Sequence, residues 1–300
     1  MTELKRYRTM VSDSALWTGF HFRHDDVVIS PPPKCGTSWL QMLCASLIFD
    51  SSEFDRPLTE ISPWLDATTY DFAATTAMLE AQTHRRFIKT HTPLDGLPFA
   101  EGVTYLCSGR DPRDAAVSFD NAIANVDAAK MIEAAALAGM DPGAALPPPP
   151  PEDPRERFWL WADAEFINGP VGVGTLANFA HHLQTFWDRR HERGVVLFHY
   201  QDLLDDLPGQ TRRLATVLGI EVSDERIEQL AAEATFDRVR ERADQLAPGV
   251  DHQLWRSNRD FFRSGTSGQW RGLLSDDDLR RYRKRLAELA SPDLVAWLHR

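Results

Sequence analysis

The sequence predicts a three-layer α/β/α fold, in which a central parallel sheet lies between two layers of helices. Three observations predict it. Short runs of β-branched and aromatic residues, typical of buried strands, alternate with longer segments of helical apolar periodicity. The first of these runs leads through a tight loop directly into a helix. The chain has 300 residues, which suits one large domain of this kind, so we expect residues 1–300 to form a single domain.

The segment that begins at Val27 predicts a strand, a loop and a helix in close succession. Residues 27–30 are a short run with three β-branched apolar side chains, and a Pro-rich turn follows at residues 31–33. From Leu40 to Leu47, apolar residues recur at positions i, i+3, i+4 and i+7. That spacing predicts a helix that packs one face against a sheet.

Three further strands and several helices are predicted along the chain. The strands are expected at residues 86–90, 102–108 and 195–200. Asp111 before Pro112 is a typical helix start, because Asp caps the first free N–H groups and Pro fits the first helical position. Further helices are predicted over residues 78–85, from Phe158, over 176–187, over 207–219 with Gly219 at the end, and from Ser223, Ser275 and Ser291.

Residues 125–153 differ in composition from the rest of the chain. They are rich in Ala and then contain five consecutive prolines at residues 147–151. Long stretches of this kind in a compact domain are either functional loops, such as lids, or disordered insertions. Both interpretations remain open, and strand-like segments beyond residue 153 indicate an excursion within one domain.

Composition excludes several classes of protein. The formal net charge is −11, which argues against a nucleic-acid or anionic-membrane surface. No apolar stretch approaches the ~20 residues of a membrane span, and the N-terminal residues do not resemble a signal peptide. Three cysteines are an odd number, which favours free thiols over a disulfide framework. We therefore expect a cytoplasmic protein whose anion sites are local positive pockets.

The loop after the first strand predicts a phosphate site. It contains Lys34, Gly36, Thr37 and Ser38 and ends where the helix begins. Free backbone N–H groups and the positive end of the helix dipole attract an anion at such a place. The spacing is not that of the common nucleotide triphosphate loop, in which the Lys follows the second Gly directly.

This loop resembles the 5′-phosphosulfate loop of the cytosolic-type sulfotransferases, Pro-Lys-Ser-Gly-Thr-Thr-Trp, with Cys35 and Ser38 as the two differences. Three more segments resemble that family in the same order. They are residues 88–91, which end in a Lys-Thr-His run, residues 105–119, and residues 261–270. The likeness extends from about residue 25 to about residue 275, and four motifs in register are a specific signal.

The resemblance implies a P-loop-type fold and 3′-phosphoadenosine-5′-phosphosulfate (PAPS) as sulfuryl donor, with adenosine 3′,5′-bisphosphate (PAP) as product and no metal. It implies a small-molecule acceptor with a hydroxyl or amine group, and either a monomer or a homodimer. Because the donor has two phosphate ends, the family's positions imply two anion sites. The residues carried over are Lys34, Cys35, Gly36, Thr37 and Ser38 for the 5′ end, Arg110, Ser118, Arg263, Ser264 and Gly265 for the 3′-phosphate, and Trp39, Tyr200, Thr235 and Phe236 for adenine.

The resemblance also implies a mechanism. His91 corresponds to the family's catalytic histidine, and imidazole can accept a proton near neutral pH. Lys34 would neutralise charge on the leaving phosphate. Lys89 lies two residues before His91 in a strand, so the two side chains share a face and Lys89 could polarise the sulfuryl group.

Other interpretations of these residues and of the chain remain. Arg110 could simply pair with Asp111 or Asp114, and Trp39 could be an ordinary core residue. Ser264 stands where the family usually has Lys, Gln269 where it has Asp, and the usual dimer motif is absent. The rival functions are a magnesium-dependent P-loop kinase or nucleotide hydrolase and a nucleotide-binding module without catalysis.

The sequence says least about the acceptor. Aromatic residues could line an apolar pocket for a phenol, sterol or other lipophilic alcohol, or they could be ordinary anchors of surface loops. The candidates are Trp17, Phe20, Phe22, Trp64, Tyr70 and Phe72.

Overall fold

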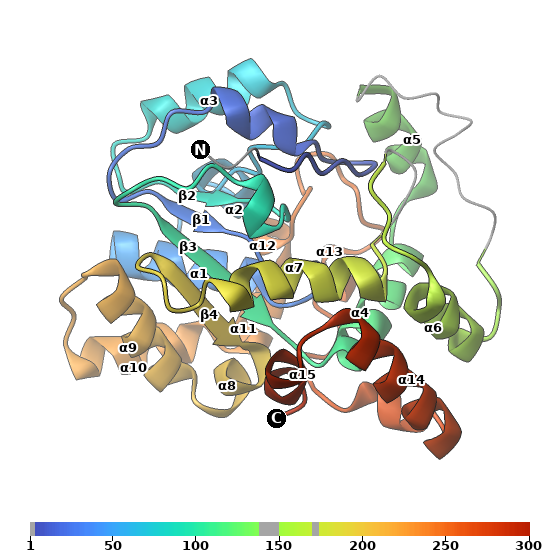
Figure 1. The fold of residues 1–300 in the computed structure, drawn as a ribbon. Coiled ribbons are helices and arrows are strands. Elements are labelled where there is room, and N and C mark those ends of the chain that lie inside the picture. Colours follow the sequence, from blue (N-terminus) through green and yellow to red (C-terminus); the bar gives the residue numbers. More distant parts are fainter. Residues whose placement is uncertain (1–3, 138–149, 170–173) are drawn as a thin grey trace.

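A computed structural model describes residues 4–137, 150–169 and 174–300 (Figure 1). In this part of the chain, four parallel strands form one sheet in the order β2-β1-β3-β4. The strands are β1 (Val27–Ile29), β2 (Phe87–Lys89), β3 (Thr104–Gly109) and β4 (Val195–His199). In the register, Val28 lies opposite Ile88 on one side and Tyr105 on the other. The predicted parallel sheet is confirmed.

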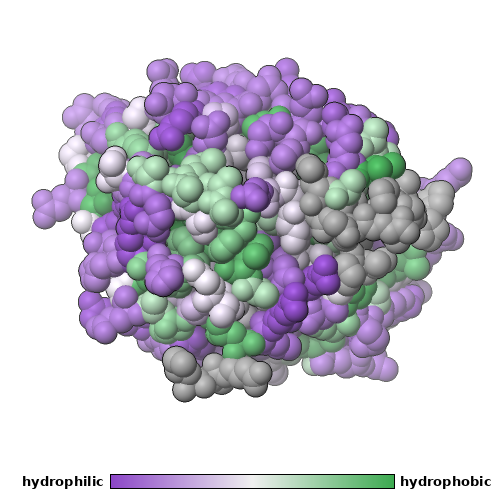
Figure 2. All heavy atoms as spheres, turned by 90° about the horizontal axis from the view of Figure 1, so that it is seen from above, coloured by the Kyte–Doolittle hydropathy of each residue, from purple (hydrophilic) through white to green (hydrophobic). Residues whose placement is uncertain are grey.

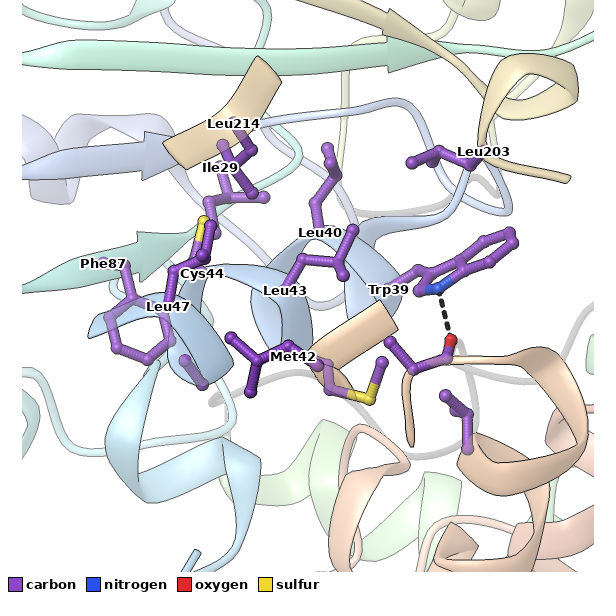
Figure 3. Packing of buried hydrophobic residues seen from close by; sticks show 14 of the residues in the cluster. Ile29, Trp39, Leu40, Met42, Leu43, Cys44, Leu47, Phe87, Leu203 and Leu214 are labelled. Atoms are coloured by element: carbon purple, nitrogen blue, oxygen red, sulfur yellow. Dashed lines mark hydrogen bonds between the residues drawn. The ribbon is translucent and has the colours of Figure 1, made fainter. Parts of the chain in front are cut away.

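Successive residues of each strand point to opposite faces, and each face has its own hydrophobic cluster. Val27 and Ile29 pack on one side with the helix α1 (Thr37–Phe49), and Figure 3 shows Ile29, Leu40 and Phe87 within this cluster. Val28 and Tyr105 pack on the other side with α7 (Leu176–Asp188) and α15 (Pro292–Leu298). These two clusters make the three layers, with the sheet between the two helical layers.

The remaining elements surround these layers. The helices are α2 (Leu58–Ile61), α3 (Phe72–Ala81), α4 (Pro112–Ala124), α5 (Ala128–Leu137), α6 (Pro154–Asp163), α8 (Tyr200–Asp205), α9 (Leu207–Leu218), α10 (Asp224–Glu233), α11 (Phe236–Glu241), α12 (Ala243–Leu246), α13 (Asn258–Phe261) and α14 (Asp276–Leu289), with short 3₁₀ turns η1 (Ser14–Gly19), η2 (Leu94–Gly96) and η3 (Gln269–Gly272). On the face seen from above in Figure 2, apolar residues gather near the middle among polar ones.

The predicted helix ends are largely confirmed. The Asp111 carboxylate accepts a hydrogen bond from the backbone N–H of Arg113, and Pro112 occupies the first turn of α4. Gly219 closes α9 with φ of 63°, a left-handed conformation that glycine adopts without strain. Ser223 and Ser275 accept hydrogen bonds at the starts of α10 and α14.

Two helix positions differ from the sequence prediction. The helix expected over residues 78–85 is α3, which starts earlier because the Asp71 carboxylate caps it by accepting from the N–H of Ala74, and it ends at Ala81. The helix expected from Phe158 starts at Pro154, because Asp153 caps it in the same way. Within the excursion at 125–153, α5 forms, and residues 138–149 lie outside the described residues.

Candidate active site

One cavity of about 500 Å³ opens at the carboxyl ends of the strands. Each strand leads into a residue that lines it: Lys34 after β1, His91 after β2, Arg110 after β3 and Tyr200 after β4. Because parallel strands all end at the same edge of a sheet, segments far apart in the sequence meet here. This arrangement brings together most of the residues that the sequence analysis singled out.

The loop between β1 and α1 has the backbone of an anion cradle. Lys34 and Gly36 both have positive φ, 66° and 91°, and Gly36 is the N-cap of α1. A Cβ atom on Gly36 would lie 3.2 Å from the ring of Tyr200, so the backbone passes close to that ring. The Thr37 hydroxyl is buried and, among the described residues, has no hydrogen-bond partner. A buried polar group without a partner is unfavourable, and an anion bound at this helix start would satisfy it.

Lys34 is held against Phe261, the last residue of α13. Its Nζ lies 3.7 Å from the centre of the Phe261 ring and 3.5 Å from the Phe261 carbonyl oxygen. Burial, together with the nearby positive charges of Arg110 and Lys89, lowers the pKa of the Lys34 amine to about 7. A doubly charged phosphate at the loop would reverse that balance and favour the ammonium form.

Arg110 faces the same cavity from the end of β3. Its Nη1 donates to the carbonyl oxygen of Lys34 at 3.1 Å, and its Nη2 donates to that of Thr266 at 3.0 Å. The guanidinium lies 4.2 Å from the centre of the Tyr200 ring, while its Nε is buried with no partner in the residues that the structure describes. Neither Asp111 nor Asp114 pairs with it. Asp111 binds Arg113, and Asp114 accepts from the backbone N–H groups of Gly268 and Gln269.

Three aromatic residues that the sequence analysis predicted to contact adenine, Trp39, Tyr200 and Phe236, line the cavity. Trp39 and Tyr200 pack edge to face with ring centres 5.5 Å apart, and the Trp39 indole donates to the carbonyl oxygen of Ala234 at 2.8 Å (Figure 3). Gly265, with φ of 61°, lies so close to Phe236 that a Cβ atom would overlap its ring, at 2.2 Å. The Trp39 side chain is buried in the core, and it also lines the cavity.

His91 is fixed by its backbone neighbour. Its Nδ1 lies 2.8 Å from the carbonyl oxygen of Pro31. A carbonyl can only accept, so Nδ1 carries the proton and Nε2 is left as the basic nitrogen. Burial, with the charge of Lys89, lowers the pKa of His91 to about 3, so the imidazole is neutral. The Trp64 ring packs edge to face against it at 5.1 Å, and Lys89 Nζ lies 4.2 Å from the centre of the same ring.

Asp66 supports the segment that carries His91 and was missed by the sequence analysis. Its buried carboxylate accepts from the hydroxyls of Thr90, at 2.8 Å, and Thr92, at 2.6 Å, the two neighbours of His91. It also accepts from the indole of Trp64 at 2.8 Å. The sequence gives only an indirect signal, a hydroxyl residue on each side of the histidine.

His182 on α7 is a second missed residue. Its Nε2 donates to the carbonyl oxygen of Ser30, at 2.7 Å, at the end of β1. Burial lowers its pKa to about 4, so it too is neutral. It lines the cavity and holds the start of the phosphate loop against α7.

The other predicted nucleotide residues divide into two groups. Ser38, Ser118, Arg263, Ser264 and Gly265 line the cavity, and Arg263 donates to the Gln269 side chain. The Cys35 side chain is fully buried in the core beneath the loop, where burial raises its thiol pKa to about 12, so only its backbone belongs to the cradle. Thr235 is not among the lining residues, and its hydroxyl donates to the carbonyl oxygen of Ala232 at 3.2 Å.

The aromatic candidates for the acceptor pocket divide in the same way. Trp64 and Tyr70 line the cavity. Trp17, Phe20, Phe22 and Phe72 pack in the hydrophobic cluster beneath the sheet instead, and Phe20 lies against the guanidinium of Arg86. The expectation that Phe20 and Phe22 line the pocket is therefore wrong. The rings of Phe20 and Phe22 pack in the core instead, where their burial is favourable.

The described part of the chain holds no group of three or more His, Cys, Asp or Glu side chains placed to bind a metal ion. Every helix in the described ranges is too short or too polar to cross a bilayer. The unpartnered Thr37 hydroxyl and Arg110 Nε, with the two glycines that keep backbone close to aromatic rings, fit a nucleotide with two anionic ends.

Comparison with known proteins agrees with this geometry. The family described as "Sulfotransferase domain" matches residues 24–291. The chain is 42% identical over its whole length to a glycolipid sulfotransferase of Mycobacterium bovis (strain BCG / Pasteur 1173P2) and 41% identical to one of Mycobacterium tuberculosis (strain ATCC 25618 / H37Rv), covering 95% of each.

Two solved structures show the same fold. The first is retinol dehydratase in complex with androsterone and the inactive cofactor PAP, with a TM-score of 0.71, 20% identity and coverage of 93% of this chain and 86% of that one. The second is a mouse sulfotransferase complexed with PAP, with a TM-score of 0.68, 20% identity and coverage of 95% and 91%. The family match favours sulfuryl transfer over the kinase and the non-catalytic alternatives. By its sequence match along nearly all of its length and by its strand order and loop geometry, this chain belongs to the sulfotransferase family.

Proposed function

We propose that this protein transfers a sulfuryl group from PAPS to a hydroxyl group of a small-molecule acceptor, with His91 as general base. The observation that supports this most directly is the placement of His91 and Lys34 on one cavity. His91 has its Nδ1 proton committed to Pro31, so Nε2 is the nitrogen that can take a proton from an acceptor hydroxyl.

The chain's own residues account for the binding of the donor. The loop at Lys34 and the start of α1 would hold the 5′ end through backbone N–H groups and the Thr37 hydroxyl. Arg110, Ser118 and Arg263 would hold the 3′-phosphate, where a planar guanidinium can bind two oxygens at once. Tyr200, Trp39 and Phe236 would enclose the adenine. PAPS supplies the sulfuryl group to be transferred.

The positive charges of two lysines, Lys34 and Lys89, complete the proposed mechanism. Lys34 would carry a proton when the anionic 5′ end is bound and so stabilise the charge that develops on the leaving phosphate. Lys89 faces the cavity beside Trp64 and would act on the sulfuryl oxygens. Burial lowers the pKa of the Lys89 amine to about 8, against the opposing charges of Asp66 and Asp251.

The acceptor class is taken from the relatives. Two mycobacterial proteins with 41–42% identity are named glycolipid sulfotransferases, and we propose a glycolipid acceptor for this chain as well. A cytoplasmic location, a single-domain organisation, and a monomeric or homodimeric state stay predictions.

Two measurements test the proposal. Titration calorimetry with PAP should show binding, and labelled PAPS should transfer its sulfuryl group to a panel of hydroxylated and amine acceptors. Binding without transfer to any acceptor in the panel would favour the non-catalytic alternative. Turnover of ATP with magnesium, in the absence of sulfuryl transfer, would favour the kinase or hydrolase.

A further inference from the structure

A small polar cluster lies in the wall of the cavity apart from the nucleotide residues. The Tyr70 hydroxyl donates to Oδ1 of Asp251 at 2.9 Å. The Tyr70 and His252 rings pack against each other with centres 4.5 Å apart. All three residues line the cavity, and none belongs to the segments that resemble the nucleotide site.

This cluster has hydrogen-bonding capacity left over. Tyr70 is the only side chain among the described residues that donates to Asp251, which leaves Oδ2 without a partner. The Nε2 atom of His252 is buried, and in the described ranges no group bonds to it. An open carboxylate oxygen and an open imidazole nitrogen together can accept from and donate to hydroxyl groups.

The cluster is near the reacting groups. The charge of Asp251 acts on the amine of Lys89, which lies over the Trp64 ring, and Trp64 in turn packs against His91. A ligand group bound at the cluster would therefore share the cavity with His91. The ammonium of Lys89 also compensates the charge of Asp251, so the cluster favours a neutral polar group over a second cation.

The cavity that contains the cluster also has apolar lining residues. They include Met78, Val126, Met131, Leu254 and Trp255. Pockets of this kind use apolar walls to take up hydrophobic area and a few placed polar groups to select a ligand. An acceptor that uses both features has a polyhydroxylated head and an apolar tail.

We propose that Tyr70, Asp251 and His252 form a subsite for the neutral polyhydroxyl head, such as a glycosyl group, of an amphipathic acceptor. The inference rests on the proposed function, because it names the part of the site that selects the acceptor. Hydroxyl groups of the head donate to Oδ2 of Asp251 and pair with Nε2 of His252. The apolar tail lies along the walls, and one hydroxyl remains for His91.

Binding, rather than turnover, is the readout that tests this subsite. Octyl β-glucoside, 1-octanol and octylamine are titrated into the protein by calorimetry, with and without PAP, below the concentration at which the glucoside forms micelles. The wild-type protein is expected to bind the glucoside about tenfold or more tightly than the alcohol. The hydroxyl groups of the glucoside can form hydrogen bonds to the charged carboxylate of Asp251, and each such bond makes the free energy of binding more favourable.

Asp251→Asn keeps the shape of the side chain and removes its charge. We expect it to weaken glucoside binding about tenfold and to leave octanol binding nearly unchanged, with Tyr70→Phe acting in the same direction. Asp260→Asn is the matched control, because Asp260 is a carboxylate on α13 that lines the cavity and lies outside the cluster. It should leave both affinities unchanged. Thermal unfolding of each variant excludes a loss of fold.

Three results would overturn the subsite. They are equal binding of glucoside and alcohol by the wild-type protein, an equal loss of both in Asp251→Asn, and tighter binding of octylamine that depends on Asp251. Glucoside binding that depends on Asp251, without sulfuryl transfer to any acceptor, would support the subsite and count against the proposed function alone. These results therefore distinguish a failure of the proposed subsite from a failure of the proposed function.

Discussion

The Nδ1 atom of His91 lies 2.8 Å from the carbonyl oxygen of Pro31, so the segment that follows β2 is bonded to the loop that follows β1. This bond fixes the tautomer of the imidazole and its orientation relative to the phosphate loop. The loop proposed to hold the nucleotide and the proposed base are thereby one connected unit.

His91→Ala should lower kcat by about 10²- to 10⁴-fold, the usual contribution of general base catalysis. PAP affinity should be nearly unchanged, because His91 is not among the residues proposed to hold the nucleotide. Steady-state kinetics and PAP calorimetry separate the two effects. His24→Ala, a change of an exposed histidine just before β1, is the control. A parallel loss of PAP binding and turnover in His91→Ala would contradict the assignment as a base.

Lys34 should take up a proton when PAP binds at pH 8. In the free protein burial lowers its pKa to about 7, so most of the amine is neutral at pH 8. The bound phosphate raises the pKa of Lys34. The affinity for PAP is therefore highest below pH 7, and it falls as the pH rises through 7 towards the higher pKa of Lys34 in the complex. Calorimetry in two buffers of different ionisation enthalpy measures the uptake.

Lys34→Arg is the matched variant for this measurement, because a guanidinium stays protonated at every pH used. Its proton uptake at pH 8 should be clearly smaller than that of the wild-type protein. Working at pH 8 also keeps the phosphates of PAP fully ionised in both states. Equal uptake by the two proteins would show that another group, such as Lys89, is the one that titrates.

Gly265→Ala should weaken PAP binding, because the added Cβ would overlap the Phe236 ring at 2.2 Å and push it out of the part of the cavity that we propose holds adenine. Gly268→Ala is the control. It has the same left-handed strain, with φ of 82°, but its Cβ would meet the Arg271 side chain only at an ordinary 3.4 Å. Both variants lose about 1 kcal/mol of stability to strain, so a difference in PAP affinity isolates the steric contact. Equal affinities would remove Phe236 from the nucleotide site.

The sequence was sufficient to predict the sheet and to single out many of the residues that line the cavity, because these depend on local patterns. Strand runs, helix caps and the Lys34 loop are each readable within a few residues, and parallel strands bring their ends together. Asp66 was not predictable in this way, because its partners Thr90 and Thr92 follow it by 24 and 26 residues. Phe20 and Phe22 were misassigned because an aromatic residue has the same sequence signal in a core as in a pocket.

Asp66→Asn should lower both stability and kcat. The Asn side chain retains only one oxygen for hydroxyls of Thr90 and Thr92 and the indole of Trp64, so at least one buried donor loses its partner. Such a loss costs about 1–3 kcal/mol. Because these residues surround His91, its ring is expected to lose its fixed position, and kcat should fall more than PAP affinity. Urea unfolding and steady-state kinetics measure the two effects.

Asp26→Asn distinguishes positioning from general destabilisation. Asp26 is equally buried and binds Arg86, but it lies before β1, at the opposite edge of the sheet from the cavity. Asp26→Asn removes the charge of one partner of a buried ion pair, so it should reduce the free energy of unfolding at least as much as Asp66→Asn does. Its kcat, measured at a temperature where the variant stays folded, should remain close to that of the wild-type protein. If kcat tracked stability in the same way in both variants, Asp66 would act only as a structural residue. If kcat fell in Asp66→Asn alone, the carboxylate that holds Thr90 and Thr92 would also be what holds the base in place.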